Sequence, residues 1–213
     1  MKRALIAAML FAAGAASAED AQPPGRRAAH PDRPEWEFAL TAYPTQPRGG
    51  DTTTSAIAAA DRGPLHLEGR YGYEAKDARS AFAGWTFSGG DQLAWELTPI
   101  VGGGWGPLHA FIPGFEASLA WGSFDVYTEA EFVRDRDTHE NDYNYSWNEL
   151  GFKATEHVRL GLAGQRTRSY GVDREFQRGP FVQLSWKRAT LGAFWFNPGS
   201  HEQVFVGAIG VAF

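Results

Sequence analysis

Acidic side chains are the residues of this sequence best placed to do chemistry, and many of them recur at every second position of short segments. Glu129 and Glu131 are two residues apart, as are His66 and Glu68. Residues two apart share one face of a β-strand, because side chains alternate across it. A carboxylate beside a histidine can orient an imidazole for nucleophilic chemistry. Any alternating strand offers such a pair, so this spacing alone is weak evidence for catalysis.

Recognisable catalytic motifs are absent from the sequence. Its six histidines fall in no nucleophile or metal motif, and neither G-x-S-x-G nor H-E-x-x-H occurs. The chain has no cysteine, which excludes disulfides and thiolate metal ligands. We therefore expect no enzyme, no resident metal and no cofactor. The formal net charge of −5 also argues against nucleic acid as a partner, since phosphate binding needs a basic patch.

One acidic segment, 135–142, has the oxygen ligands that calcium prefers. It departs from an EF-hand loop, because Glu140 stands where the loop needs glycine and Ser146 where it needs a bidentate glutamate. A solvated surface loop explains the same composition. Whether 134–143 binds calcium is therefore left open.

The elements that carry these residues follow from an alternation of apolar and polar residues after Pro34. In 124–132, Phe124 and Val126 lie on one face, whereas Asp125 and Glu129 lie on the other. This period predicts strands with one apolar and one polar face. The segments run to about 10 residues, the length that a tilted strand needs to cross a bilayer. A soluble β-sandwich also alternates, but it does not need strands of this length.

Tight turns and longer polar connections follow one another in strict order. The tight turns are 61–64, 88–91, 121–123, 155–157 and 187–189, and the longer connections are 45–53, 75–79, 102–108, 134–143, 169–176 and 197–202. Short turns on one rim and long loops on the other are typical of outer-membrane barrels. We predict an all-β fold, an up-and-down antiparallel transmembrane β-barrel of twelve strands. Ten strands are the alternative, because 54–60 is the weakest predicted strand and an even strand count would then require the loss of a neighbouring strand as well.

The two ends of the chain support export to the outer membrane of a Gram-negative bacterium. Lys2 and Arg3 precede an apolar run and a small-residue site at 16–18, which predicts a signal peptide over 1–18, cleaved after Ala18. The run is shorter than the about 20 residues of a spanning helix. The proline-rich segment 19–34 predicts a flexible periplasmic tail, and 35–213 the barrel. The last strand ends in Phe213, which resembles the signal that such proteins present to the barrel assembly machinery.

In a barrel of this kind the polar faces point into the lumen. The predicted lumen residues are Glu37, His66, Glu68, Arg70, Glu74, Glu96, Glu116, Asp125, Glu129, Glu131, Glu149, Lys153 and Arg159. The simplest interpretation is a polar interior whose charges pair with one another and with water. An excess of carboxylates can also favour small cationic solutes, because carboxylate rings select positive ions.

Arg166 and Arg168 are exceptions to the alternation. They share parity with Leu160 and Leu162, which face lipid in the predicted strand 157–168. Near the outer rim a lipid-facing arginine is tolerated and could bind lipopolysaccharide phosphates bidentately. The alternative is a β-bulge that turns both side chains into the lumen.

Several segments resemble a family of uncharacterised bacterial outer-membrane β-barrel proteins, and the resemblance covers nearly the whole mature chain. They are LHLEGRYGYE at 65–74, FSGG at 87–90, WELTP at 95–99, QRTR at 165–168, QRG at 177–179 and FNP at 196–198. The resemblance implies the fold and no mechanism. From the residues we expect a narrow passive channel for small solutes, or a structural membrane protein in contact with outer-membrane lipid. The alternatives are a lipid-modifying hydrolase, or an adhesion or receptor barrel that uses 45–53 and 134–143.

The terminal aromatic residue provides the first test. Deleting Phe213 should reduce the amount of assembled barrel, because the assembly machinery would lose its recognition signal. The measurement is the heat-modifiable band of the outer-membrane fraction on gels. Assembly at the level of the intact chain would refute a role for Phe213.

Overall fold

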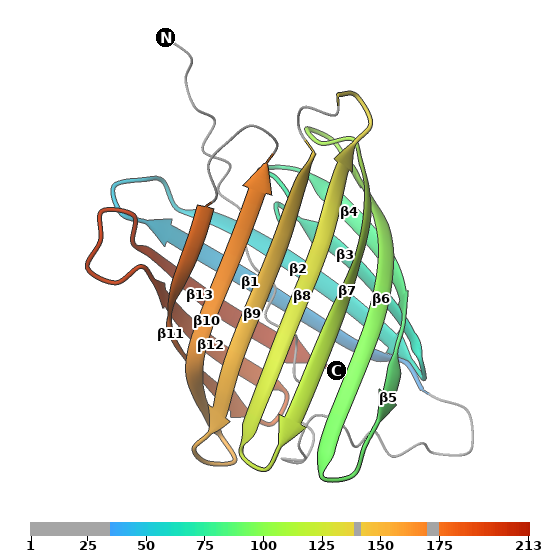
Figure 1. Ribbon diagram of the computed structural model, residues 1–213, viewed down its shortest axis with the longest axis vertical. Helices are drawn as coiled ribbons and strands as arrows, with labels where there is room; N and C mark the ends of the chain where they lie inside the picture. The colour runs from blue at the N-terminus through green and yellow to red at the C-terminus, as the bar shows by residue number, and fades with distance from the viewer. Residues whose placement is uncertain (1–34, 139–141, 170–174) are drawn as a thin grey trace.

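The computed structural model describes residues 35–138, 142–169 and 175–213, which form β-strands and no helix (Figure 1). The strands are β1 (Glu37–Pro47), β2 (Thr53–Arg62), β3 (Leu65–Tyr71), β4 (Arg79–Trp85), β5 (Phe87–Gly89), β6 (Leu93–Trp105), β7 (Ala110–Trp121), β8 (Phe124–Asp135), β9 (Tyr143–Lys153), β10 (Val158–Ser169), β11 (Glu175–Trp186), β12 (Ala189–Phe196) and β13 (Val204–Ala212). Within these ranges no helix is long and apolar enough to span a membrane.

The strands form one antiparallel sheet that closes on itself. β1 pairs with β13, and β4 pairs with β6, so the sheet forms a closed ring without a free edge. The first and last strands are joined by reciprocal backbone bonds, from Phe38 N to Phe213 O at 3.0 Å and from Phe213 N to Phe38 O at 2.9 Å. This is the predicted up-and-down barrel.

The prediction of twelve strands is confirmed, with the short β5 as an addition. Gly84 pairs with Ile100 and Phe87 pairs with Leu97, so the register against β6 does not change between β4 and β5. The sequence predicts one strand between the connection 75–79 and the tight turn 88–91, and β4 and β5 together take its place. The weakest predicted strand, 54–60, is observed as β2, which pairs with β1 and β3 along its length. The ten-strand alternative is therefore wrong.

Tight turns gather at one rim, and the longer connections lie at the opposite rim (Figure 1). Gly63 and Gly122 adopt φ of 57° and 58° in two tight turns, a left-handed conformation that glycine reaches without steric cost. The C-terminus lies on the tight-turn rim, because Ala212 N donates to the carbonyl of Arg188 in the turn between β11 and β12.

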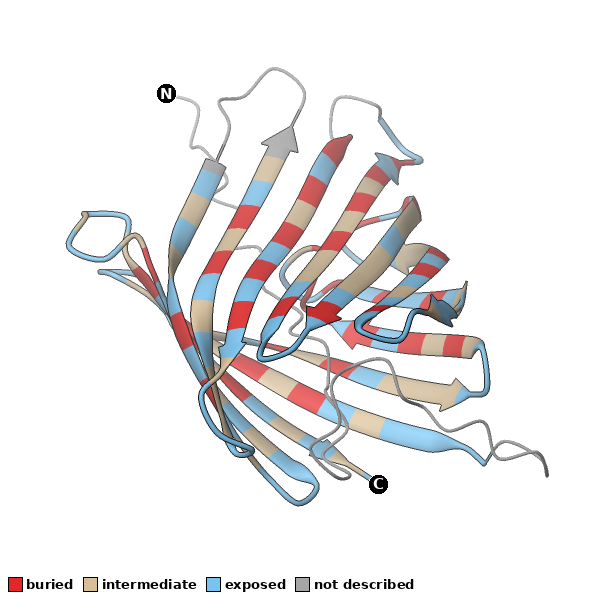
Figure 2. Ribbon diagram, turned by 60° about the horizontal axis from the view of Figure 1, so that its bottom comes forward, coloured by how far each residue is buried: buried red, intermediate tan, exposed pale blue. Residues whose placement is uncertain are grey.

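Burial alternates along the strands (Figure 2). Because successive side chains point to opposite faces of a strand, the buried residues share the inner face of the barrel. The outer face is apolar and exposed, and includes Leu40, Val101, Phe115, Val126, Leu150, Leu160, Leu162, Val182, Leu184, Leu191, Phe205 and Ile209. Exposed aromatic residues such as Trp36, Trp121 and Trp186 lie near the strand ends, as in the aromatic girdles of membrane barrels. A belt of this kind is unfavourable in water and is matched by lipid. The protein is located in the outer membrane.

Candidate functional site

The most charged part of the interior surrounds Arg70 of β3. Its Nε donates to Glu68 Oε2 at 2.6 Å, and its Nη1 donates to Glu131 Oε1 at 2.6 Å and to Glu129 Oε1 at 3.1 Å. Glu74 and Glu116 lie 3.7 Å and 4.0 Å from the guanidinium. Five carboxylates therefore surround one guanidinium, and we call this group the Arg70 cluster.

The Arg70 cluster crosses the lumen. β3 and β8 are not neighbours in the ring, since β4, β6 and β7 lie between them on the shorter way round. Arg70 nevertheless reaches Glu129 and Glu131 on β8. The guanidinium also packs over Phe82, 4.2 Å from the ring centroid, and over Tyr73 at 4.6 Å. Cation–π contacts of this kind hold a planar guanidinium in place.

A second ionic group in the interior is centred on Arg159 of β10. Arg159 Nε donates to Asp125 Oδ1 at 2.9 Å, and its Nη1 donates to Gln183 Oε1 at 2.7 Å and also to Glu149. Phe181 lies against the guanidinium, with 4.7 Å from its Cζ to the ring centroid. This group ties β8, β9, β10 and β11 together.

Aromatic side chains fill the interior beside the Arg159 group. Trp147 of β9 contacts Phe194 and Phe196 of β12 edge to face, with ring centroids 5.3 Å and 5.4 Å apart. Its indole Nε1 donates to Glu149 Oε1 at 2.9 Å. Trp147 and Phe196 are 0% exposed, as is Glu129 in the Arg70 cluster. Side chains therefore occupy the lumen at these levels.

His66 lies at the edge of the Arg70 cluster, close to the tight-turn rim. Its Nδ1 is 2.8 Å from Asp61 Oδ1 of β2, and its Nε2 is 3.4 Å from Glu68 Oε1. Asp61 was predicted to lie in the tight turn 61–64, so its contact with His66 was not predicted. The two-residue connection Gly63-Pro64 was the available signal, because a hairpin with that loop pairs residue 61 with residue 66.

The structure places most predicted lumen residues on the inner face. Buried or half-buried there are His66, Glu68, Arg70, Glu74, Glu96, Glu116, Asp125, Glu129, Glu131, Glu149, Lys153 and Arg159. Glu37 is exposed at the start of β1. Tyr73 shares parity with Leu65, Leu67 and Tyr71, so alternation through 65–74 predicts an outward-facing side chain. That prediction is wrong: β3 ends at Tyr71, and Tyr73 is buried inside, where its OH donates to Glu129 Oε1 at 3.2 Å.

The acidic loop and the two rim arginines are only partly described. Asp135 N donates to Asp142 Oδ1, and Asp137 N donates to Asp135 Oδ1, both at 2.8 Å. Residues 139–141 lie outside the described part, so calcium binding and the adhesion role of 134–143 stay predictions. Arg166 is exposed on the outer face of β10, whereas the side chain of Arg168 lies outside the described residues.

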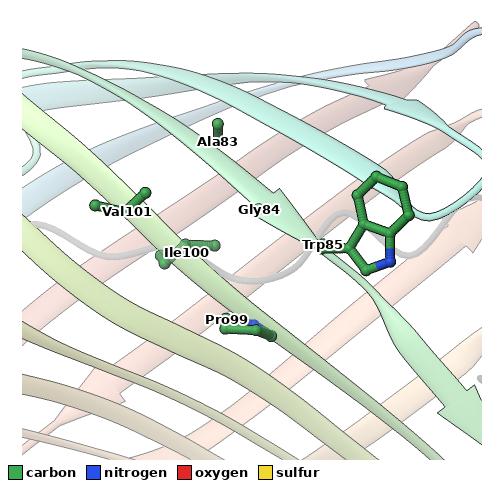
Figure 3. Close-up of a pocket in the computed structure, with 6 residues that line it drawn as sticks. All are labelled: Ala83, Gly84, Trp85, Pro99, Ile100 and Val101. Atoms are coloured by element: carbon green, nitrogen blue, oxygen red, sulfur yellow. The ribbon is translucent and has the colours of Figure 1, made fainter.

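An apolar hollow of about 310 Å³ lies on the outer face between β4 and β6 (Figure 3). It is lined by Ala83, Gly84, Trp85, Pro99, Ile100 and Val101. An acyl chain fits such a surface. None of the six side chains carries a hydroxyl, imidazole or carboxylate, so this hollow has no group that could hydrolyse a lipid.

The closed ring, its apolar belt and its charged interior define an outer-membrane β-barrel with a porin-like fold. Two solved structures are similar to it: KdgM porin in complex with disordered oligogalacturonate, with a TM-score of 0.59, and KdgM porin, with 0.57. Each is 9% identical to this chain, and each match covers 82% of this chain and 98% of the porin. The likeness therefore concerns the fold alone. No family model and no curated protein matches the sequence.

The exposed arginine of β10 leads to a test of lipopolysaccharide binding. Replacing Arg166 with alanine should weaken lipopolysaccharide association about two- to fivefold, because an exposed ion pair contributes about 0.5–1 kcal/mol. The measurement is binding of lipopolysaccharide to the detergent-solubilised barrel. Arg188→Ala, at the tight-turn rim where the outer leaflet is absent, is the matched control. Equal losses for the two variants would refute a site at Arg166.

Glu74, in the connection between β3 and β4, should make the stability of the barrel depend on pH. Burial, together with the charge of Glu131, raises the pKa of Glu74 to about 7, although Arg70 opposes the shift. The folded state therefore holds a proton that the unfolded chain releases above its ordinary pKa of 4.5. This contribution is complete below pH 4.5 and is lost as the pH rises through 7.

The corresponding test replaces Glu74 with glutamine, which keeps the volume and removes the titration. The intact barrel should lose thermal stability between pH 5 and pH 8, and Glu74→Gln should lose less. Exposed Glu202 gives the control, since Glu202→Gln should keep the profile of the intact chain. Identical profiles for Glu74→Gln and the intact barrel would contradict the assignment.

Proposed function

We propose that this protein is a narrow channel for small cationic solutes across the outer membrane. The observation that carries the proposal is the Arg70 cluster, in which five carboxylates surround one guanidinium inside the barrel. Carboxylates lining a lumen favour positive ions and repel negative ones. The low dielectric of the surrounding lipid and protein strengthens that preference.

The charges elsewhere in the interior do not reverse this field. Arg159 is matched by Asp125 and Glu149, so the second ionic group carries no positive excess. The similar KdgM porin was solved with oligogalacturonate, an acidic sugar chain. A polyanion would meet the uncompensated carboxylates of the Arg70 cluster, so a shared fold does not argue for a shared substrate.

The packing of the interior limits how such a channel can conduct. Arg70 is 3% exposed and bridges β3 to β8, so solutes pass this level only when its side chain moves or water enters the cluster. The same burial favours a second candidate function, an occluded barrel with a structural role. The two candidates differ in conductance.

Two variants in planar bilayers test the channel. Glu129→Gln with Glu131→Gln should lower the cation preference several-fold in permeability ratio, because the amides remove charge and keep volume. Arg70→Ser should increase the single-channel conductance, because it removes the side chain that bridges the lumen. Both effects are measured on the purified barrel in symmetric and graded salt.

Matched controls lie away from the cluster. Glu202→Gln, in an exposed connection, should keep the ion preference, and Arg166→Ala, on the outer face, should keep the conductance. An anion preference would overturn the proposal. The absence of conductance in both the intact barrel and Arg70→Ser would establish the occluded structural barrel instead.

A further inference from the structure

We propose that His66, Glu68 and Glu116 form a binding site for a divalent transition-metal ion inside the barrel, near its tight-turn rim. The three residues come from β3 and β7 and offer one imidazole nitrogen and two carboxylate oxygens. These ligand atoms all lie within 4.8 Å of one another. The site does not depend on conduction, because an occluded barrel could hold the ion equally well.

The buried imidazole is the first observation that points to a ligand. His66 is 8% exposed, and its Nε2 makes no hydrogen bond although it lies 3.4 Å from Glu68 Oε1. A buried polar atom without a hydrogen bond is costly and calls for a partner. The lone pair of a neutral imidazole nitrogen is among the commonest metal ligands in proteins.

Asp61 orients this imidazole. Its Oδ1 lies 2.8 Å from His66 Nδ1, and the β2–β3 hairpin pairs the two residues directly. In a neutral imidazole, donation of the Nδ1 proton to Asp61 leaves the lone pair on Nε2, on the side of Glu68, and a metal ion that binds there takes the place of a second proton. This is the carboxylate–histidine–metal arrangement that fixes the tautomer of metal-binding histidines and raises their basicity.

Arg70 binds one oxygen of the Glu68 carboxylate and leaves the other free to act as a ligand. Its Nε binds Oε2 at 2.6 Å, which leaves Oε1 on the side of His66. Glu116 approaches from β7, with its Oε1 4.0 Å from the same guanidinium. The Arg70 cluster holds one arginine for four acidic side chains besides Glu74, so an ion of charge +2 would offset negative charge that Arg70 alone leaves uncompensated.

The ligand set and its spacing suit zinc and related first-row ions. Bonds of about 2.0–2.2 Å in a tetrahedral site place ligand atoms roughly 3.3 Å apart. His66 Nε2 and Glu68 Oε1 are already 3.4 Å apart, and Glu116 offers an oxygen within 4.8 Å of both ligand atoms. One nitrogen with two oxygens favours these ions over calcium and magnesium, which prefer oxygen alone. Three protein ligands leave a fourth position for water.

The test is zinc titration of the folded, chelator-treated barrel in detergent, followed by calorimetry. The intact barrel should bind one Zn²⁺ and gain thermal stability, since a ligand bound only by the folded state stabilises it. His66→Gln and Glu116→Gln should weaken binding by about 100-fold or more, and Asp61→Asn by about 10–100-fold. X-ray absorption should show nitrogen and oxygen ligands at about 2.0–2.2 Å.

A surface histidine supplies the matched control. His109 is exposed and 3.1 Å from Asp137, and His109→Gln should leave zinc affinity unchanged. Zinc binding that survives His66→Gln and is lost in His109→Gln would show a surface site and overturn the proposal, as would a barrel that binds no zinc. Heat-modifiable mobility checks that each variant is folded, and if His66→Gln fails to fold, Glu116→Gln decides. A barrel that binds zinc without conducting supports this site and rejects the channel, and the reverse result does the opposite.

Discussion

The structure depends on one constraint, the need of every backbone N–H and C=O in hydrocarbon for a partner within the chain. A sheet meets that need only when it closes, because an open edge exposes unpaired groups. β1 closes on β13, and β4 closes on β6. The interruption between β4 and β5 is tolerated because Thr86 N donates to the carbonyl of Pro64 at 2.7 Å.

Closure decides where charge can go. With one face of every strand turned to lipid, the alternation of side chains sends the carboxylates inward. There they meet a space too small to hydrate them all, so they need cations as partners. Arg70 forms ion pairs with five of them, and Arg159 forms ion pairs with two. In these two groups, two arginines therefore face seven carboxylates.

The sequence predicts only the features that depend on the two-residue alternation of side chains and on the residues of the turns. The strands and their inner faces follow from local spacing, which is why even β2, the weakest predicted strand, could be located. Contacts across the lumen follow from the stagger between distant strands, which no local pattern encodes. Arg70 meets Glu129 and Glu131, which lie 59 and 61 residues away in the chain. Tyr73 was misplaced because the chain leaves β3 after Tyr71, and the alternation then loses its meaning.

The shortage of positively charged side chains in the interior affects both the packing of the barrel and its chemistry. The contact between Arg70 and Glu129 crosses the lumen at the level where the carboxylates are densest, so attraction for cations and obstruction to their passage coincide. A barrel built only for rigidity could have filled this space with aromatic side chains, as it does around Trp147. Placing carboxylates there instead costs desolvation free energy that Arg70 only partly offsets. A cation drawn into the cluster supplies the missing charge, whether it passes through or stays at His66.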